Sequence, residues 1–223
     1  MKVVFFDLFE TLITEKTKSA FQSRSPNYVK LRTTRDRVVQ WWDDFGERVM
    51  TGEFSNCLAK FVHMRDEVGS SVSDRELAEI AREYEQWKRR VISEVDPGVL
   101  EMLGEVRTLG LGIGIISNAM PWEALAWNAC PLRDHVDEVV FSCEVGLMKP
   151  DRKIYDLACA RMGVRPSDAY FVGDGGFDEL RGAAAAGMTA IQAAWYLRQE
   201  VAWPWDHPLP RAESIVSLPS MLN

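Results

Sequence analysis

An acidic side chain ends the first apolar segment of the chain. Residues 3–6, Val-Val-Phe-Phe, lead directly into Asp7, which is the pattern of a strand buried on both faces that stops at a site. A carboxylate at such a position has lost water, so it needs a cation or a hydrogen-bond donor, and with that support it can act as a nucleophile. Thr11 follows four residues later, where its hydroxyl could bond this carboxylate or a bound anion. Phe9 shares the strand face of Asp7 and offers no proton. Asp7 is therefore the first candidate for chemistry, and the alternative is an ordinary turn.

Two further apolar runs end in polar side chains. Ser117 and Asn118 follow the run 112–116 and precede a helix expected to begin at Pro121, so their small polar groups suit a phosphate oxygen. Lys149 precedes Pro150 after the run 138–141. A lysine at this position could neutralise a nucleophilic carboxylate and an anionic substrate.

The fourth polar segment is rich in glycine and carboxylates. It reads Gly-Asp-Gly-Gly-Phe-Asp-Glu over residues 173–179 and follows the run 169–172. Glycines allow tight turns, and Asp174 and Asp178 would face the same space. Together with Asp7 they would form a hard-oxygen site of the kind that Mg²⁺ prefers.

The helices and strands between these polar segments must bring them together. Over residues 97–218, apolar segments typical of strands alternate with helical patterns. Such alternation predicts a doubly wound parallel α/β sheet with helices on both faces, whose ligands bind beyond the carboxyl ends of the strands. We expect helices at 97–108, 121–129, 151–162 and 178–186, and strands at 112–116, 138–141, 169–172, 189–192 and 214–218.

Residues 14–95 have a different pattern. Residues 14–34 are polar and read as a connection, and apolar residues then recur at helical spacing from 35 to 91. Ser73 and Glu76 form a capping box that begins the last of these helices. We therefore expect two domains: a catalytic core formed by 1–13 and 96–223, and a smaller all-helical domain formed by 14–95.

Composition restricts the class of protein. The chain has 223 residues, 47% of them hydrophobic, and a net charge of −7, which disfavours nucleic acid as the main partner. Nothing approaches the length of a membrane span, and the N-terminus lacks a signal-peptide pattern. Four widely spaced cysteines without a Cys-x-x-Cys pair indicate reduced thiols in a cytoplasmic protein. The partner expected is a small, anionic substrate, and the chain could be a monomer or a homodimer.

Several residues have ordinary explanations that compete with functional ones. The three histidines have no partner spacing and are not proposed as bases or ligands. A run of six basic residues without an intervening acid is either a solvated loop or an attractor for an anionic substrate; it comprises Lys16, Lys18, Arg24, Lys30, Arg32 and Arg35. Arg37 follows shortly after and could, like Arg32 and Arg35, meet a substrate carboxylate. The Trp- and Pro-rich segment 195–210 either wraps the core or contacts a second subunit.

The four polar segments, in this order, resemble the motifs of the haloacid dehalogenase superfamily, and 14–95 occupies the place of its helical cap. The resemblance implies that Asp7 forms a covalent aspartyl intermediate while Ser117 and Lys149 hold the transferring group. It further implies that Mg²⁺ is held by Asp7, Asp174, Asp178 and the backbone carbonyl of Phe9. Thr11 and Asn118 would bind substrate, and Glu179 could replace Asp178.

The sequence departs from the superfamily's phosphatases at Phe9. They usually carry a second Asp there, which protonates the leaving group, and such help is worth about 10²–10⁴-fold. The superfamily's 2-haloacid dehalogenases have an aromatic residue at this position, because a halide leaves without a proton. Asp174 favours the opposite interpretation, since those dehalogenases use no metal and uncompensated acids would repel Asp7.

We give the acidic metal site more weight than the missing acid. The prediction is a Mg²⁺-dependent phosphatase in which the acid comes from the cap or the leaving group departs unaided, as from an acyl phosphate. A metal-independent 2-haloacid dehalogenase is the alternative. A third possibility is a module that binds a phosphorylated ligand or a protein with little turnover.

Overall fold

The chain builds a six-stranded sheet with the strand order β3-β2-β1-β4-β5-β6, and all of its pairings are parallel. The computed structural model describes residues 2–15, 27–197 and 209–222. The strands are β1 (Val3–Phe6), β2 (Gly112–Ser117), β3 (Glu138–Phe141), β4 (Ala169–Gly173), β5 (Thr189–Ala193) and β6 (Arg211–Ala212). The predicted doubly wound α/β fold is confirmed.

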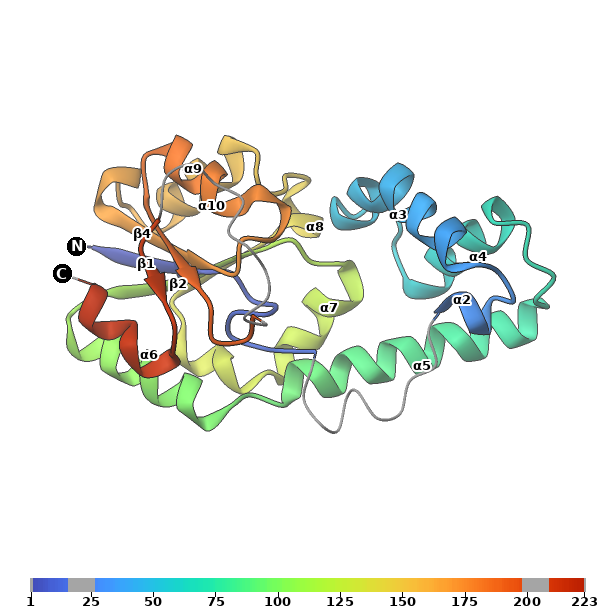
Figure 1. Cartoon of the computed structure of the whole chain (residues 1–223), viewed down its shortest axis with the longest axis horizontal. Coiled ribbons are helices and arrows are strands. Elements are labelled where there is room, and N and C mark those ends of the chain that lie inside the picture. The colour runs from blue at the N-terminus through green and yellow to red at the C-terminus, as the bar shows by residue number, and fades with distance from the viewer. Residues whose placement is uncertain (1, 16–26, 198–208, 223) are drawn as a thin grey trace.

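Helices cover both faces of this sheet, as Figure 1 shows. The helices that alternate with the strands are α6 (Pro97–Thr108), α7 (Pro121–Ala126), α8 (Ser142–Val145), α9 (Arg152–Arg161) and α10 (Glu179–Ala186). Short 3₁₀ helices lie at Trp127–Ala129, Pro131–His135, Pro166–Asp168, Gly176–Asp178, Ile215–Ser217 and Pro219–Met221.

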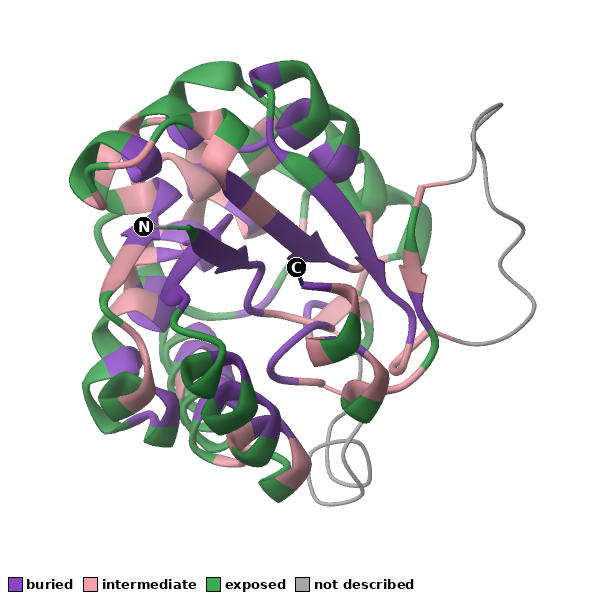
Figure 2. Cartoon of the chain, turned by 90° about the vertical axis from the view of Figure 1, so that its left-hand side faces the viewer, coloured by how far each residue is buried: buried purple, intermediate pink, exposed green. Residues whose placement is uncertain are grey.

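The central strand β1 is buried on both sides. Val4 and Phe6 belong to one apolar cluster and Val3 and Phe5 to another, on the opposite face, because successive side chains of a strand point to opposite faces. Figure 2 shows the buried strands enclosed by helices with exposed outer faces. Full burial of each phenylalanine stabilises the fold by about 2 kcal/mol.

The register of β1 on β2 depends on one glycine. Phe5 lies opposite Gly114, and a Cβ at that position would come within 2.6 Å of the Phe5 ring. Glycine at 114 therefore lets a large aromatic ring pack between the strands at the point where β1 must remain straight to deliver Asp7.

In the described part of the chain between β1 and α6, the helices are α2 (Asn27–Lys30), α3 (Arg35–Met50), α4 (Cys57–Glu67) and α5 (Asp74–Ser93). The described part of this segment contains no strand. In Figure 1, α2, α3 and α4 lie to the right of the sheet, and α5 runs from them toward it. The predicted capping box of α5 is present: the Ser73 hydroxyl accepts from the Glu76 backbone N–H, and the Glu76 carboxylate accepts from the Ser73 N–H.

Two sequence expectations are wrong in detail. The polar connection 14–34 contains the one-turn helix α2. Residues 214–218 form no strand: the Ser217 hydroxyl donates to the Ser214 carbonyl at 2.7 Å, and such local hydrogen bonds favour a 3₁₀ turn over a sheet ladder. The last strand is instead the short β6. Among the described residues, no helix is both long and apolar enough to cross a membrane.

Candidate active site

The ends of three neighbouring strands bring the polar segments together. β1 lies between β2 and β4, with Phe6 opposite Ile115 on one side and Val172 on the other. The backbone N–H of Asp7 donates to the Val172 carbonyl at 2.8 Å. Since parallel strands end at one edge of a sheet, Asp7 is flanked by Ser117 at the end of β2 and by Asp174 directly after β4.

A buried lysine lies against Asp7. Lys149 is 2% exposed, its Nζ lies 2.5 Å from Asp7 Oδ1, and it also bonds Glu179 Oε2. Burial alone would lower the pKa of Lys149, but the charges of Asp7 and Glu179 outweigh this and hold the pKa above its usual value. The lysine therefore stays positively charged and can balance negative charge on the nucleophile.

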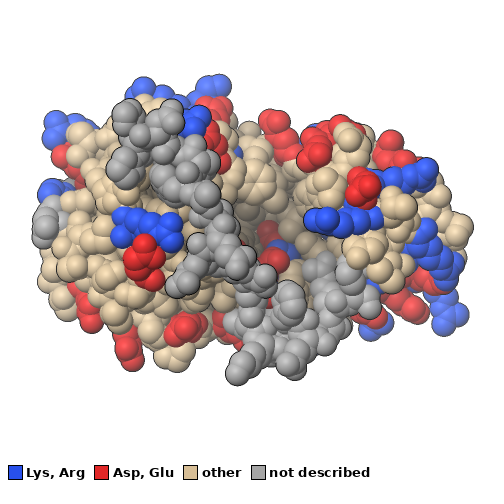
Figure 3. All heavy atoms as spheres, viewed as in Figure 1, with Lys and Arg blue, Asp and Glu red and all other residues tan. Residues whose placement is uncertain are grey.

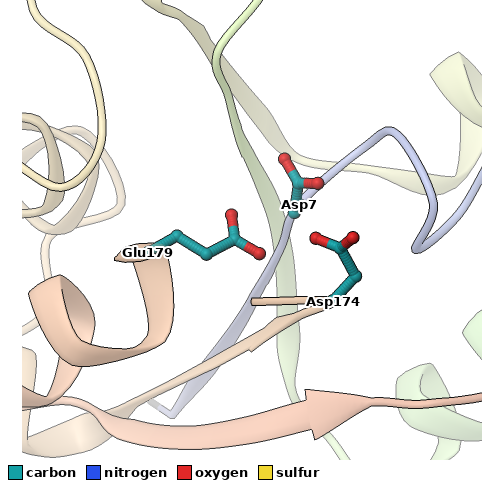
Figure 4. Close-up of side chains that lie close together, drawn as sticks. All are labelled: Asp7, Asp174 and Glu179. Atoms are coloured by element: carbon teal, nitrogen blue, oxygen red, sulfur yellow. The ribbon is translucent and has the colours of Figure 1, made fainter. Parts of the chain in front are cut away.

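Three carboxylates gather around this one cation. An oxygen from each of Asp7, Asp174 and Glu179 lies within 4.8 Å of the others, and Figure 4 shows the three side chains converging from β1, the end of β4 and the start of α10. Burial, and then the neighbouring Asp7, raises the pKa of Glu179 to about 8. Burial, with Asp7 and Glu10, also raises the pKa of Asp174.

This surplus of acid fits a divalent cation. Three ionised carboxylates beside one ammonium would leave two uncompensated negative charges, and burial first, then the charge of Asp7, raises the pKa of Asp174 and Glu179. Carboxylate oxygens are the ligands that Mg²⁺ prefers. The predicted carbonyl ligand from Phe9 has no contact here that tests it and stays a prediction.

Asp178 lies away from the cluster, contrary to the sequence expectation. Its side chain is 45% exposed and its Oδ1 lies 3.5 Å from Nε of Arg181. Phe177 and Asp178 both have left-handed backbones, with φ of 53° and 56°. This double turn points the next residue, Glu179, into the site instead, which was the alternative that the sequence left open.

Glu179 occupies its place because residue 173 is a glycine. A Cβ there would lie 2.1 Å from Glu179 Oε1. The same oxygen accepts the Gly175 N–H at 3.1 Å, so the glycine-rich turn both admits and holds the carboxylate.

Two of the candidate residues, Thr11 and Ser117, carry buried hydroxyl groups. Neither Thr11 Oγ1 nor Ser117 Oγ has a hydrogen-bond partner among the described residues, and both residues are fully buried. A buried hydroxyl without a partner costs free energy, so both are suited to an incoming anion. Asn118 differs: its amide donates to the Lys149 carbonyl at 3.0 Å and accepts the Lys149 N–H at 2.8 Å. Its side chain thus bonds the backbone of Lys149, and the predicted contact with substrate stays a prediction.

Sequence reasoning missed Lys88, whose ammonium lies 4.6 Å from the centre of the Phe9 ring. Lys88 is buried, 2.5 Å from Glu123 of α7 and bonded to Glu15. Burial would lower its pKa, but Glu123 first and then Tyr84 and Glu15 raise it above its usual value. A lysine on the apolar face of α5, between Tyr84 and Val91, was the available signal.

The other candidate residues lie elsewhere or outside the described residues. Arg32 pairs with Glu76 at 2.6 Å, and Arg37 donates to the Val68 carbonyl at 2.8 Å. His63 accepts from Trp41 Nε1 at 3.1 Å among aromatic rings. Residues 16–26, with Lys16, Lys18 and Arg24, and residues 198–208 of the Trp- and Pro-rich segment lie outside the described residues. Trp195 Nε1 donates to the Thr11 carbonyl at 2.9 Å.

The amino-acid sequence was compared with family models and with known proteins. The family model described as haloacid dehalogenase-like hydrolase matches residues 1–187. A phosphoserine phosphatase of Thermus thermophilus is 29% identical over 74% of this chain and 61% of its own length. The (S)-2-haloacid dehalogenase 1 of a Pseudomonas species is 33% identical over 43% of this chain and 42% of its own. The chain thus spans less than two thirds of the length of these relatives.

Solved structures share the fold. A 2-haloacid dehalogenase from Pseudomonas syringae covers 100% of this chain and 98% of its own length, with a TM-score of 0.69 and 22% identity. At that identity the likeness concerns the fold alone.

Proposed function

Because the chain belongs to the haloacid dehalogenase-like hydrolases, we propose that it is a Mg²⁺-dependent phosphohydrolase with Asp7 as its nucleophile. The observation that carries the proposal is the excess of buried acid: three carboxylates share one ammonium, and the pKa of Glu179 rises to about 8. Phosphatases and dehalogenases both occur among the relatives, and the acid cluster is what favours the phosphatase in our proposal.

The residues of the site divide the work of phosphoryl transfer. Asp7, Asp174 and Glu179 would hold Mg²⁺, which would offset negative charge when the phosphate arrives. Lys149 holds Asp7 Oδ1, so Oδ2 is left to attack phosphorus. The Thr11 and Ser117 hydroxyls donate to phosphoryl oxygens, and helices α2 to α5 act as the cap that closes over the substrate.

The absence of an acid at Phe9 restricts the leaving group. Lys88 lies over the ring, but its raised pKa and two carboxylate partners make it a poor proton donor at neutral pH. The leaving group should therefore depart as a stable anion, which a carboxylate of an acyl phosphate does.

A 2-haloacid dehalogenase is the second candidate, and Phe9 is the observation that favours it. Against it, Arg32 and Arg37 are bonded to Glu76 and to the Val68 carbonyl, away from the site. A haloacid carboxylate would also meet the negative charge of the acid cluster.

One panel of assays tests the proposal. Release of phosphate from acetyl phosphate and p-nitrophenyl phosphate, and of chloride from L-2-chloropropionate, is measured with and without Mg²⁺. We expect Mg²⁺-dependent phosphate release. Metal-independent chloride release without phosphate release would refute the proposal in favour of the dehalogenase.

Two neighbouring acids supply a matched pair of variants. Glu179→Gln should lower the Mg²⁺-dependent rate at least about tenfold, as loss of a group around a bound metal does. Asp178→Asn removes the same charge one residue earlier, at an exposed position, and should leave the rate within about twofold. The reverse order would contradict the assignment of Glu179.

A further inference from the structure

A cleft of about 460 Å³ opens between α3 and the loops that carry the catalytic residues. Its walls are formed by Trp42, Gly46, Met50, Met148 and Phe177, with Asp43 and Glu47 beside them. Figure 3 shows the molecular surface hollowed between the part that holds the sheet and the helices on the right. The volume lies within the usual range of small-molecule pockets, about 300–1,000 Å³.

Two wall residues of the cleft are close in sequence to residues of the proposed active site. Met148 directly precedes Lys149, and Phe177 lies between Asp174 and Glu179. A substrate whose phosphate reaches Lys149 would therefore extend its other end along these walls.

Phe177 is the most unusual wall residue. Its side chain is 62% exposed, and its backbone is left-handed with φ of 53°, a conformation that costs about 1–3 kcal/mol outside glycine. An exposed aromatic ring held in a strained turn beside a catalytic group is suited to contact a ligand.

The charges of the cleft select against anions. Its charged lining residues are Asp43 and Glu47, and no lysine or arginine lines it among the residues that the structure describes. A substrate with a second negative group would meet like charge there, while an apolar group would bury surface against Trp42 and Phe177.

We propose, resting on the proposed function, that this cleft binds the acyl group of an acyl phosphate, and that this group is apolar and carries no second negative charge. Asp7 Oδ2 forms a bond to phosphorus while the bond between phosphorus and the acyl oxygen breaks. The electron pair leaves on the carboxylate product, which needs no proton and so agrees with Phe9. Water then hydrolyses the aspartyl phosphate, which restores the Asp7 carboxylate and releases dihydrogen phosphate.

The test compares kcat/KM for acetyl, benzoyl and succinyl phosphate in the presence of Mg²⁺, with spontaneous hydrolysis subtracted. Partial burial of a phenyl group should raise kcat/KM for benzoyl phosphate roughly 30-fold above acetyl phosphate. Succinyl phosphate, with its second carboxylate, should fall below acetyl phosphate. Equal kcat/KM values for the three substrates would overturn the inference about the cleft but not the proposed phosphohydrolase activity. If all three were hydrolysed only at the background rate, with no effect of Mg²⁺, both the inference and the proposed function would be overturned.

Variants of the walls give a second measurement. Phe177→Ala, at an exposed position, should lower the ratio of benzoyl to acetyl kcat/KM about tenfold, with folding checked by circular dichroism. Glu47→Gln should raise the relative rate with succinyl phosphate about fivefold. Asp44→Asn is the matched control on the same helix, because Asp44 faces another groove and accepts from Gln40 at 3.0 Å. A ratio unchanged in Phe177→Ala, or equal effects of Glu47→Gln and Asp44→Asn, would overturn the inference.

Discussion

Binding of Mg²⁺ to the carboxylate cluster should release protons, and the number released per ion follows from the pKa of Glu179. The three acids share one ammonium, and burial together with Asp7 raises the pKa of Glu179 to about 8. A cation binds the ionised carboxylate, so the proton held there must leave when the ion arrives.

The magnitude follows from that pKa. At pH 7 a group with a pKa of about 8 carries its proton in about 0.9 of the molecules, so about 0.9 proton is released per ion bound. Below pH 8 the apparent dissociation constant should fall about tenfold for each unit of rising pH, and above pH 8 it should level off. Asp174, whose pKa is also raised, makes the dependence steeper at the acidic end.

Without Mg²⁺, rising pH should have the opposite effect on the stability of the fold: it should lower the unfolding free energy, whereas it tightens Mg²⁺ binding. The folded chain holds a proton on Glu179 between its ordinary pKa of 4.5 and about 8, whereas the unfolded chain does not. The unfolding free energy should therefore fall as pH rises through this window. Added Mg²⁺ should restore it, most strongly at the alkaline end.

Isothermal titration calorimetry measures the proton directly. Titrations at pH 7 in two buffers with different ionisation enthalpies should give heats that differ by about 0.9 of that difference, and at pH 9 the two heats should converge. Glu179→Gln removes the titrating group and should make the heats independent of buffer at pH 7. Heats that are already independent of buffer in the unaltered chain, with equal affinity at pH 7 and 9, would refute the charge argument.

Three other predictions concern residues around the site. Gly173→Ala would place a Cβ 2.1 Å from a carboxylate oxygen of Glu179. It should weaken Mg²⁺ binding at least tenfold and lower the unfolding free energy, measured by chemical denaturation, by about 1–3 kcal/mol. The control is Gly104→Ala, where nothing lies within 4 Å; it should be neutral or stabilising by up to about 1 kcal/mol. Asn118→Ala removes both hydrogen bonds to the backbone of Lys149, the proposed catalytic lysine, and should lower kcat about 10- to 100-fold with KM little changed, so that a change in KM alone would contradict the positioning role. Partial burial raises the pKa of Cys143 to about 12, so at pH 8 only about 10⁻⁴ of this thiol is ionised. Iodoacetamide should modify it far more slowly than free cysteine, at a rate that rises about tenfold per pH unit, and fast modification at pH 8 in the native state would be inconsistent with the raised pKa.

The sheet could be predicted from sequence because its strands are short, apolar and separated by amphipathic helices. That alternation admits few arrangements other than a parallel sheet, and the observed β1, β2, β3 and β4 agree with the expected ranges to within a residue. The predicted strand at 214–218 failed because the Ser217 hydroxyl bonds the backbone of Ser214, accepting from its N–H and donating to its carbonyl, which favours a local turn over a strand.

Proximity within the site was predictable where a residue directly follows a strand. Asp7 and Asp174 are brought together by the pairing of β1 with β4, and Lys149 reaches Asp7 from the loop before α9. Their catalytic and metal-binding roles stay predictions.

The exact identity of the third acid was not predictable. Spacing alone favours Asp178, and only two consecutive left-handed residues, at positions where glycine would be expected, turn Glu179 inward. In the same way, the amide of Asn118 suits a substrate or a backbone equally well, and only the folded chain shows that it bonds Lys149. Lys88 reaches Phe9 across 79 residues of sequence, a distance that no local pattern covers.

The central place of β1 also has a consequence for synthesis on the ribosome. Asp7 is translated well before its neighbours in the fold: its backbone N–H donates to the Val172 carbonyl, and the other acids of the cluster come at 174 and 179. A growing chain therefore carries Asp7 and Lys149 without Asp174 and Glu179 until residue 179 has been translated. Truncated chains that end before Glu179 should therefore lack the assembled carboxylate cluster.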